Sequence, residues 1–130
     1  MNNRNDKQTT VSELRQWMAQ FVTERDWNQF HSPKNLAMSL TIEAGELMEH
    51  FQWLTNQQSK EIDNSVRHEV GEELADVICY AMSLANSLDI DVASAVFQKI
   101  EKNRLKYPVD EFRGRYGEND PPKISDSEAG

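Results

Sequence analysis

Apolar residues recur along most of this chain at intervals of three and four positions, a spacing typical of amphipathic helices. The first such segment runs from about Val11 to Glu24, and Thr10 with Glu13 forms a capping-box pattern at its start. Its apolar positions are Leu14, Trp17, Met18, Phe21 and Val22. We expect Trp17 to lie in the core.

Three further helices are expected, from about Pro33 to Phe51, from Ser65 to Leu88, and from the cap residue Asp91 to Lys106. No alternating segment predicts a strand. The sequence therefore predicts an all-α fold, resembling a four-helix bundle, in one domain over residues 1–116. Residues 117–130 lack periodicity and are polar, which predicts a flexible, disordered tail.

Two pairs of acids, Glu43 with Glu46 and Glu73 with Asp76, interrupt the apolar faces of the second and third helices. Residues three apart lie on one face of a helix, so each pair points two carboxylates in the same direction. Isolated buried carboxylates are costly, whereas a hard divalent cation among four of them would compensate their charge. The interrupted stripes are Leu36, Leu40, Leu47, Phe51, Leu54 and Val66, Val70, Val77, Ala81, Leu84.

A purely structural role for these acids would need basic partners. The two helices carry only Lys34 and Arg67, both near helix starts. An oxygen-only site suits Mg²⁺, with Mn²⁺ as a substitute, better than zinc. A di-iron bundle site is excluded because neither His50 nor His68 has a glutamate three positions before it. Three neighbouring acids could support such a site or simply be solvated: Glu49, Glu69 and Glu72.

Basic and aromatic residues suggest that a ligand with phosphates and a flat ring binds beside the acids. Lys99, Asn103 and Lys106 share a stripe of the fourth helix, with Arg104 beside them, and could neutralise a polyphosphate. The helix dipole alone accounts for basic residues in a last turn, but less well for Lys99. Trp27 and Trp53 stand at helix ends, His31 is close to Trp27 in sequence, and Tyr80 is one turn beyond Asp76. These four rings could pack in the core or stack on a flat base.

Composition restricts the possible partners. The chain is 38% hydrophobic and 28% charged with a net charge of −8, which argues against binding a nucleic-acid polymer. It contains no apolar run long enough to span a membrane. The single Cys79 cannot form an internal disulfide, so we expect a reducing, cytoplasmic setting.

The order of these motifs over residues 10–115 resembles the MazG-type all-α nucleoside triphosphate pyrophosphohydrolases, and most closely their dCTP pyrophosphatase branch. The residues that carry the resemblance are Glu24 to His31, Pro33 to Leu36, Glu43 to Leu47, Phe51 to Trp53, Glu72 to Val77, Lys99, Asn103, Arg104, Tyr107 and Pro108.

The resemblance implies a role for each group of residues. The acids Glu43, Glu46, Glu73 and Asp76 would bind Mg²⁺ and carry catalysis. Phosphates would be held by Lys99, Asn103, Arg104 and, less directly, Lys34, and the base by Trp27, His31, Trp53 and Tyr80. Family members assemble as dimers or dimers of dimers with sites completed by neighbouring subunits, so a homodimer or homotetramer is expected.

The function expected from this resemblance is Mg²⁺-dependent hydrolysis of a (deoxy)nucleoside triphosphate between its α and β phosphates. The substrate would be dCTP or a related pyrimidine, and the role would be to sanitise the nucleotide pool. Either Glu46 or Glu49 could take the proton of the attacking water. The alternative is a non-catalytic module of the same fold that binds or senses nucleotides, although such a module could dispense with the four acids.

Overall fold

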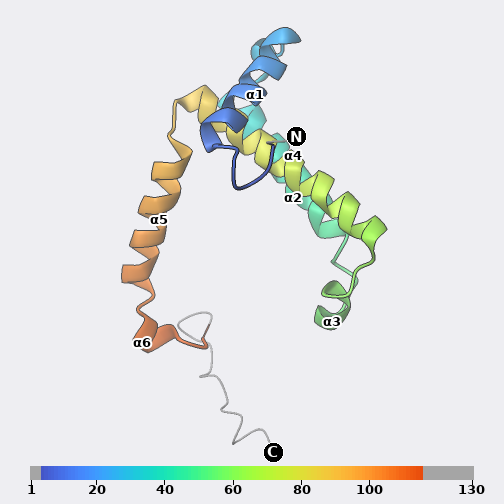
Figure 1. Cartoon of the computed structure of the whole chain (residues 1–130), viewed down its shortest axis with the longest axis vertical. Coiled ribbons are helices and arrows are strands. Elements are labelled where there is room, and N and C mark those ends of the chain that lie inside the picture. The colour runs from blue at the N-terminus through green and yellow to red at the C-terminus, as the bar shows by residue number, and fades with distance from the viewer. Residues whose placement is uncertain (1–3, 116–130) are drawn as a thin grey trace, which may run out of the picture. The chain divides into compact units, whose positions relative to one another are not determined.

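The computed structural model describes residues 4–115, and every regular element in that range is helical (Figure 1). The elements are α1 (Val11–Glu24), the 3₁₀ helix η1 (Asn28–Phe30), α2 (Pro33–Glu49), α3 (Asn56–Ser59), α4 (Asn64–Leu88), α5 (Val92–Lys106) and α6 (Val109–Phe112). The predicted all-α fold is confirmed. The tail predicted over residues 117–130 lies outside the described residues.

Local sequence signals explain where the long helices begin. Thr10 and Glu13 form the predicted capping box of α1. Ser32 caps α2 by accepting a hydrogen bond from the Asn35 amide, with Pro33 in the first turn. Asp63 caps α4, which begins at Asn64, one residue before the predicted start.

Three short helices were not predicted, and the end of α2 differs from the predicted end. Helix α3 lies in the stretch expected to be an irregular polar connection, and Thr55 and Gln58 form a capping box at its start. Helix α2 ends at Glu49, two residues before the predicted Phe51, which lies in the turn that follows. The other two additions are η1 and α6.

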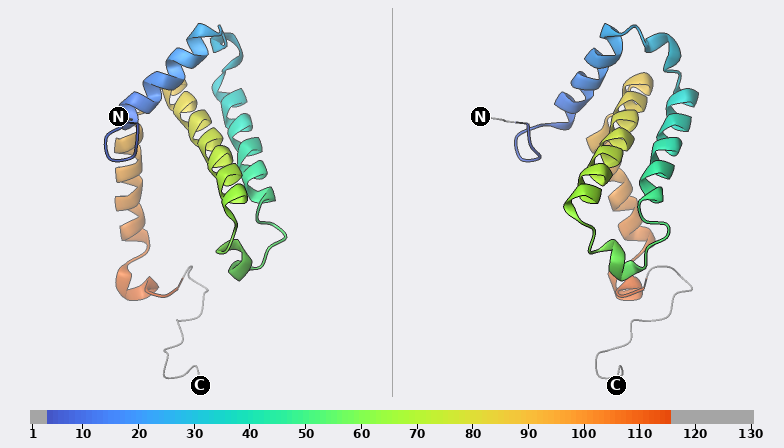
Figure 2. Two further views of the ribbon diagram at one scale, coloured as in Figure 1. Left: turned by 45° about the vertical axis from the view of Figure 1, so that its right-hand side comes forward. Right: turned by 90° about the vertical axis from the view of Figure 1, so that its right-hand side faces the viewer.

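The chain forms two compact units, Met1–Val92 and Ala93–Gly130. In the first unit α2 and α4 run antiparallel and side by side, and their pairing makes most of the contacts between helices (Figure 2). Helix α1 packs against α4. Arg15 on α1 and Asn86 on α4 link these two helices. The Arg15 Nε donates to Asn86 Oδ1 at 2.9 Å, and Asn86 Nδ2 donates to the Arg15 carbonyl at 3.0 Å.

The core of the first unit is small and centres on Leu36, which is only 2% exposed, with Val22, Met82 and Ala85 around it. Trp17 was predicted to lie in the core, and this prediction is wrong for the single chain. Its side chain is 42% exposed, and the Arg4 guanidinium lies 5.7 Å from the ring centroid. Across residues 4–115, no helix combines the length and the apolar composition that crossing a membrane requires.

Leu36→Ala is expected to lower the free energy of unfolding by about 2–5 kcal/mol, because it leaves a cavity in the most buried position of the unit. The volume-conserving control Leu36→Met should cost less than about 1.5 kcal/mol. Urea unfolding followed by circular dichroism measures both. Equal losses in the two variants would show that the packing volume at this position is unimportant.

Candidate functional site

Helices α2 and α4 bring three of the four predicted metal-binding acids together. One carboxylate oxygen each from Glu43 on α2 and from Glu73 and Asp76 on α4 lie within 4.8 Å of one another. Glu43 and Glu73 are half-buried, whereas Asp76 is exposed. The spacing of Glu73 and Asp76 places both on the α2-facing side of α4.

The environment of two of these carboxylates disfavours their charged form. Glu43 Oε2 and Glu73 Oε2 are buried and have no hydrogen-bond partner among the described residues. Burial, and then the adjacent Glu46 carboxyl, raises the pKa of Glu43 from 4.5 to about 7. Burial and Glu46 also raise the pKa of Glu73. The arrangement concentrates negative charge that the neighbouring protein groups do not compensate.

The neighbouring acids differ in position from this group. Glu46 is exposed and outside the group of three, but it is close enough to raise the pKa of both buried glutamates. Glu49 is exposed. Glu72 lies 3.0 Å from the His68 ring, and Glu69 is 3.9 Å from the ring of His50. Glu69 and Glu72 are exposed, and each contact is an ion pair when its histidine is protonated.

His31 and Tyr80 line a common cavity of about 370 Å³ beside the start of α2. Tyr80 is one helical turn beyond Asp76 on α4, as the sequence predicts. Trp27 is 41% exposed. The centroid of its ring lies 6.2 Å from that of His31 and 5.6 Å from that of Phe21. The structure thus brings His31 close to both Tyr80 and Trp27.

Trp53 does not join these three rings within one chain. It follows the C-terminal end of α2, whereas His31 precedes the N-terminal end, and a helix of 17 residues spans about 25 Å. The Trp53 side chain is 87% exposed. One chain alone therefore cannot place Trp53 against a base that contacts His31.

The predicted phosphate-binding residues of the second unit lie on α5. Lys99, Asn103 and Lys106 follow one stripe of the helix at intervals of four and three residues. Arg104 pairs with Glu101 at 3.0 Å. Lys34, on the first turn of α2, is exposed.

The donor set of the acid group fits a divalent cation. It consists only of oxygen atoms, and two of them are buried without a partner. Hard cations such as Mg²⁺ and Mn²⁺ take such oxygens as ligands, and their charge would make the ionised carboxylates favourable.

The structure also shows polar residues that no motif indicated. Ser83, Asn86 and Ser87 of α4 line a cavity with His31. The sequence offered one signal for Ser83, since it lies seven positions after Asp76 and so shares its face of the helix. It stands between Met82 and Leu84 in an apolar segment, so the sequence alone does not distinguish it from the core.

Comparisons with known proteins agree with this geometry. The rat (Rattus norvegicus) dCTP pyrophosphatase 1 is 38% identical over 125 residues, covering 92% of this chain and 74% of the relative. The human (Homo sapiens) dCTP pyrophosphatase 1 is 41% identical over 102 residues, covering 77% of this chain and 60% of the relative. The matches with the curated relatives thus cover between 60% and 74% of their lengths.

A solved structure is similar as well. The crystal structure of a pyrophosphatase from Archaeoglobus fulgidus superposes with a TM-score of 0.72 at 40% identity, covering 75% of this chain and 92% of that one. The sequence model of the MazG-like family matches residues 38–118, a range that includes all four acids. This chain belongs to the MazG-like family.

Proposed function

We propose that the protein is a Mg²⁺-dependent nucleoside triphosphate pyrophosphohydrolase. It hydrolyses dCTP or a related pyrimidine nucleotide to the monophosphate and pyrophosphate, and so sanitises the nucleotide pool of a reducing, cytoplasmic compartment. The observation that carries this proposal is the group of Glu43, Glu73 and Asp76, with two buried carboxylate oxygens that lack partners. Relatives about 40% identical carry the name dCTP pyrophosphatase 1, which supports the choice of substrate.

In the proposed reaction, water adds across the α–β phosphoanhydride and pyrophosphate leaves. Glu43, Glu73 and Asp76, with Glu46 beside them, would hold the Mg²⁺ ion, and that ion would supply charge neutralisation for the phosphates. One of the two exposed acids on α2, Glu46 or Glu49, accepts the proton of the water. No covalent intermediate is proposed, because the pKa of the only thiol, Cys79, is raised by burial and by nearby Asp76.

The side chains of α5 have the complementary role of binding phosphates. Lys99 and Arg104 contribute positive charge, and the Asn103 amide donates hydrogen bonds to phosphate oxygens. Lys34 is a further candidate at the start of α2. The proposed catalytic domain is residues 1–116.

The base pocket of the proposed enzyme needs two subunits. Trp27, His31 and Tyr80 come from one chain, and Trp53 comes from its partner, because about 25 Å of helix separates Trp53 from His31. Large apolar side chains on one face of α2 remain exposed in the single chain, with Met38 at 55% and Ile42 at 60%. Such surface is typical of an interface between subunits, which favours a homodimer or a homotetramer.

Glu43→Gln is expected to abolish pyrophosphate release from dCTP while helical circular dichroism is retained. It should also remove the rise in Tm that Mg²⁺ gives the unsubstituted protein, because a ligand that binds the folded state stabilises it. The control is Glu72→Gln, an exposed acid of α4 paired with His68, which should keep both properties. Pyrophosphate release from a panel of nucleotides assayed with Mg²⁺ shows which nucleotide is the substrate. Binding of nucleotides without any turnover would instead favour the non-catalytic sensing module.

The stability of the metal-free protein should depend on pH through Glu43. In the unfolded chain this carboxyl ionises near pH 4.5, whereas in the folded chain it stays protonated up to about pH 7. The unfolded state therefore binds fewer protons over this window, and the contribution of Glu43 to stability falls as the pH rises. The Tm of the unsubstituted protein should decrease relative to that of Glu43→Gln between pH 4.5 and 7. Parallel profiles would contradict the raised pKa.

Subunit mixing tests the shared base pocket. Trp53→Ala alone should raise the KM for dCTP by about tenfold, the effect expected from losing one stacked base. Glu43→Gln alone should be inactive. Hybrid oligomers of the two variants contain some sites with intact acids from one subunit and an intact Trp53 from the other. Activity at low dCTP should therefore exceed the weighted mean of the separate variants, and activity equal to that mean would show that each chain builds its own pocket.

A further inference from the structure

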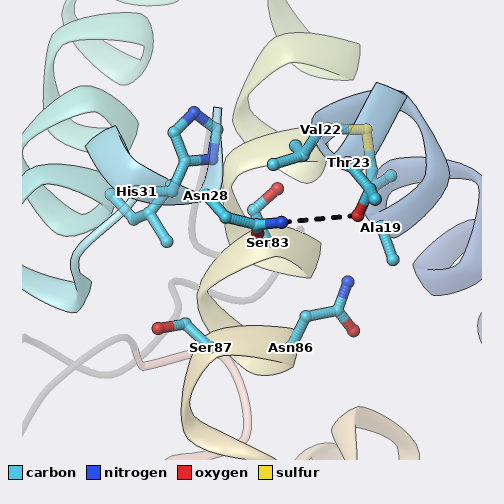
Figure 3. A pocket seen from close by; sticks show the side chains of 10 residues that line it. Ala19, Val22, Thr23, Asn28, His31, Ser83, Asn86 and Ser87 are labelled. Atoms are coloured by element: carbon cyan, nitrogen blue, oxygen red, sulfur yellow. Dashed lines mark hydrogen bonds between the residues drawn. The ribbon is translucent and has the colours of Figure 1, made fainter. Parts of the chain in front are cut away.

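A cavity of about 240 Å³ lies between α1, η1 and the C-terminal half of α4 (Figure 3). The polar residues in its wall are Thr23, Asn28, His31, Ser83, Asn86 and Ser87. Two of them already have partners. Asn28 Nδ2 donates to Thr23 Oγ1 at 3.4 Å, and Asn86 exchanges hydrogen bonds with Arg15. These bonds hold that part of the wall in place.

Two other polar atoms of the wall have no partner. His31 Nδ1 and Ser83 Oγ are both buried and form no hydrogen bond among the described residues. Ser83 is only 6% exposed, and Figure 3 shows its side chain and that of His31 among the residues that line the cavity. Buried polar groups in proteins are nearly always hydrogen-bonded, so such a pair requires an explanation.

The position of the cavity relative to the acids gives that explanation. Ser83 follows Asp76 by two helical turns, which places it on the same face of α4 and about 10 Å further along the helix axis. Tyr80 lies between them on the same face. A molecule with its charged end at the acid group can therefore extend along one face of α4 to the cavity.

We propose that this cavity receives the hydrogen-bonding edge of the substrate's base, with Ser83 and His31 as the residues that determine base specificity. This inference rests on the proposed function. A neutral imidazole with its proton on Nε2 leaves Nδ1 as an acceptor, which takes an N–H of the 4-amino group of an aminopyrimidine. The Ser83 hydroxyl donates to the adjacent ring nitrogen.

The size of the cavity agrees with this role. Pockets for drug-sized ligands have volumes of roughly 300–1,000 Å³. At about 240 Å³, this cavity suits one small ring rather than a whole nucleotide. The sugar and phosphates then lie outside it, toward the acids.

Ser83→Ala tests the assignment by comparing dCTP with dUTP, which differ only at the edge of the base. The variant should raise the KM for dCTP by about three- to tenfold, leave kcat nearly unchanged, and reduce the preference for dCTP over dUTP by a similar factor. The control Ser65→Ala removes an exposed hydroxyl near the start of the same helix and should change neither value. An unchanged KM, or equal changes for both nucleotides, would overturn the proposal.

Calorimetry with deoxycytidine, which has no phosphate, separates this inference from the proposed function. The unsubstituted protein and Glu43→Gln should bind the nucleoside equally, whereas Ser83→Ala and His31→Leu should bind it at least threefold more weakly. His31→Asn should restore binding, because its amide can supply an acceptor near the position of Nδ1. If the protein hydrolyses no triphosphate but keeps this pattern, only the proposed function fails. If hydrolysis occurs but Ser83→Ala binds deoxycytidine normally, only this inference fails.

Discussion

The antiparallel packing of α2 against α4 imposes the constraint on which the site depends, because it places carboxylates within an apolar interface. The apolar stripes of the two helices can become buried only if Glu43 and Glu73 are buried with them. One buried oxygen of each has no hydrogen-bond partner among the described residues, and burial together with the nearby Glu46 carboxyl raises the pKa of both. A divalent cation would resolve this conflict, since it would make the ionised carboxylates favourable at the position where packing requires them.

Helix α4 also sets the length of the proposed site. It is 25 residues long, and one of its faces carries Glu73 and Asp76 first, then Tyr80, and then Ser83. A single rigid element thus fixes the distance between the acids and the cavity, which no loop could hold as closely. Helix α1 is joined to the C-terminal half of α4 by the hydrogen bonds between Arg15 and Asn86. Since Asn86 also lines the cavity, these bonds hold part of its wall in place.

Much of this arrangement could be predicted from the sequence, and the exceptions have physical reasons. Periodicity and caps located the four long helices to within about two residues, and the Glu-x-x-Glu and Glu-x-x-Asp pairs indicated the acid group. Helix α3 was missed because it is only one turn long, although Thr55 and Gln58 carried a cap signal. Trp17 was assigned to the core because periodicity reports which face is apolar, not how fully one chain covers it. The Ser83 cavity could not be predicted, since it forms between helices far apart in sequence.

The acids of α2 and α4 are positioned to hold a divalent cation. Anomalous diffraction from crystals of the full chain grown with Mn²⁺ tests it most directly, because the signal locates the metal without assumptions about catalysis. We expect an anomalous peak about 2.1–2.3 Å from oxygens of Glu43, Glu73 and Asp76, near the distances at which hard divalent cations bind carboxylates. A peak elsewhere, or none at saturating Mn²⁺ with these carboxylates in the positions described here, would contradict it.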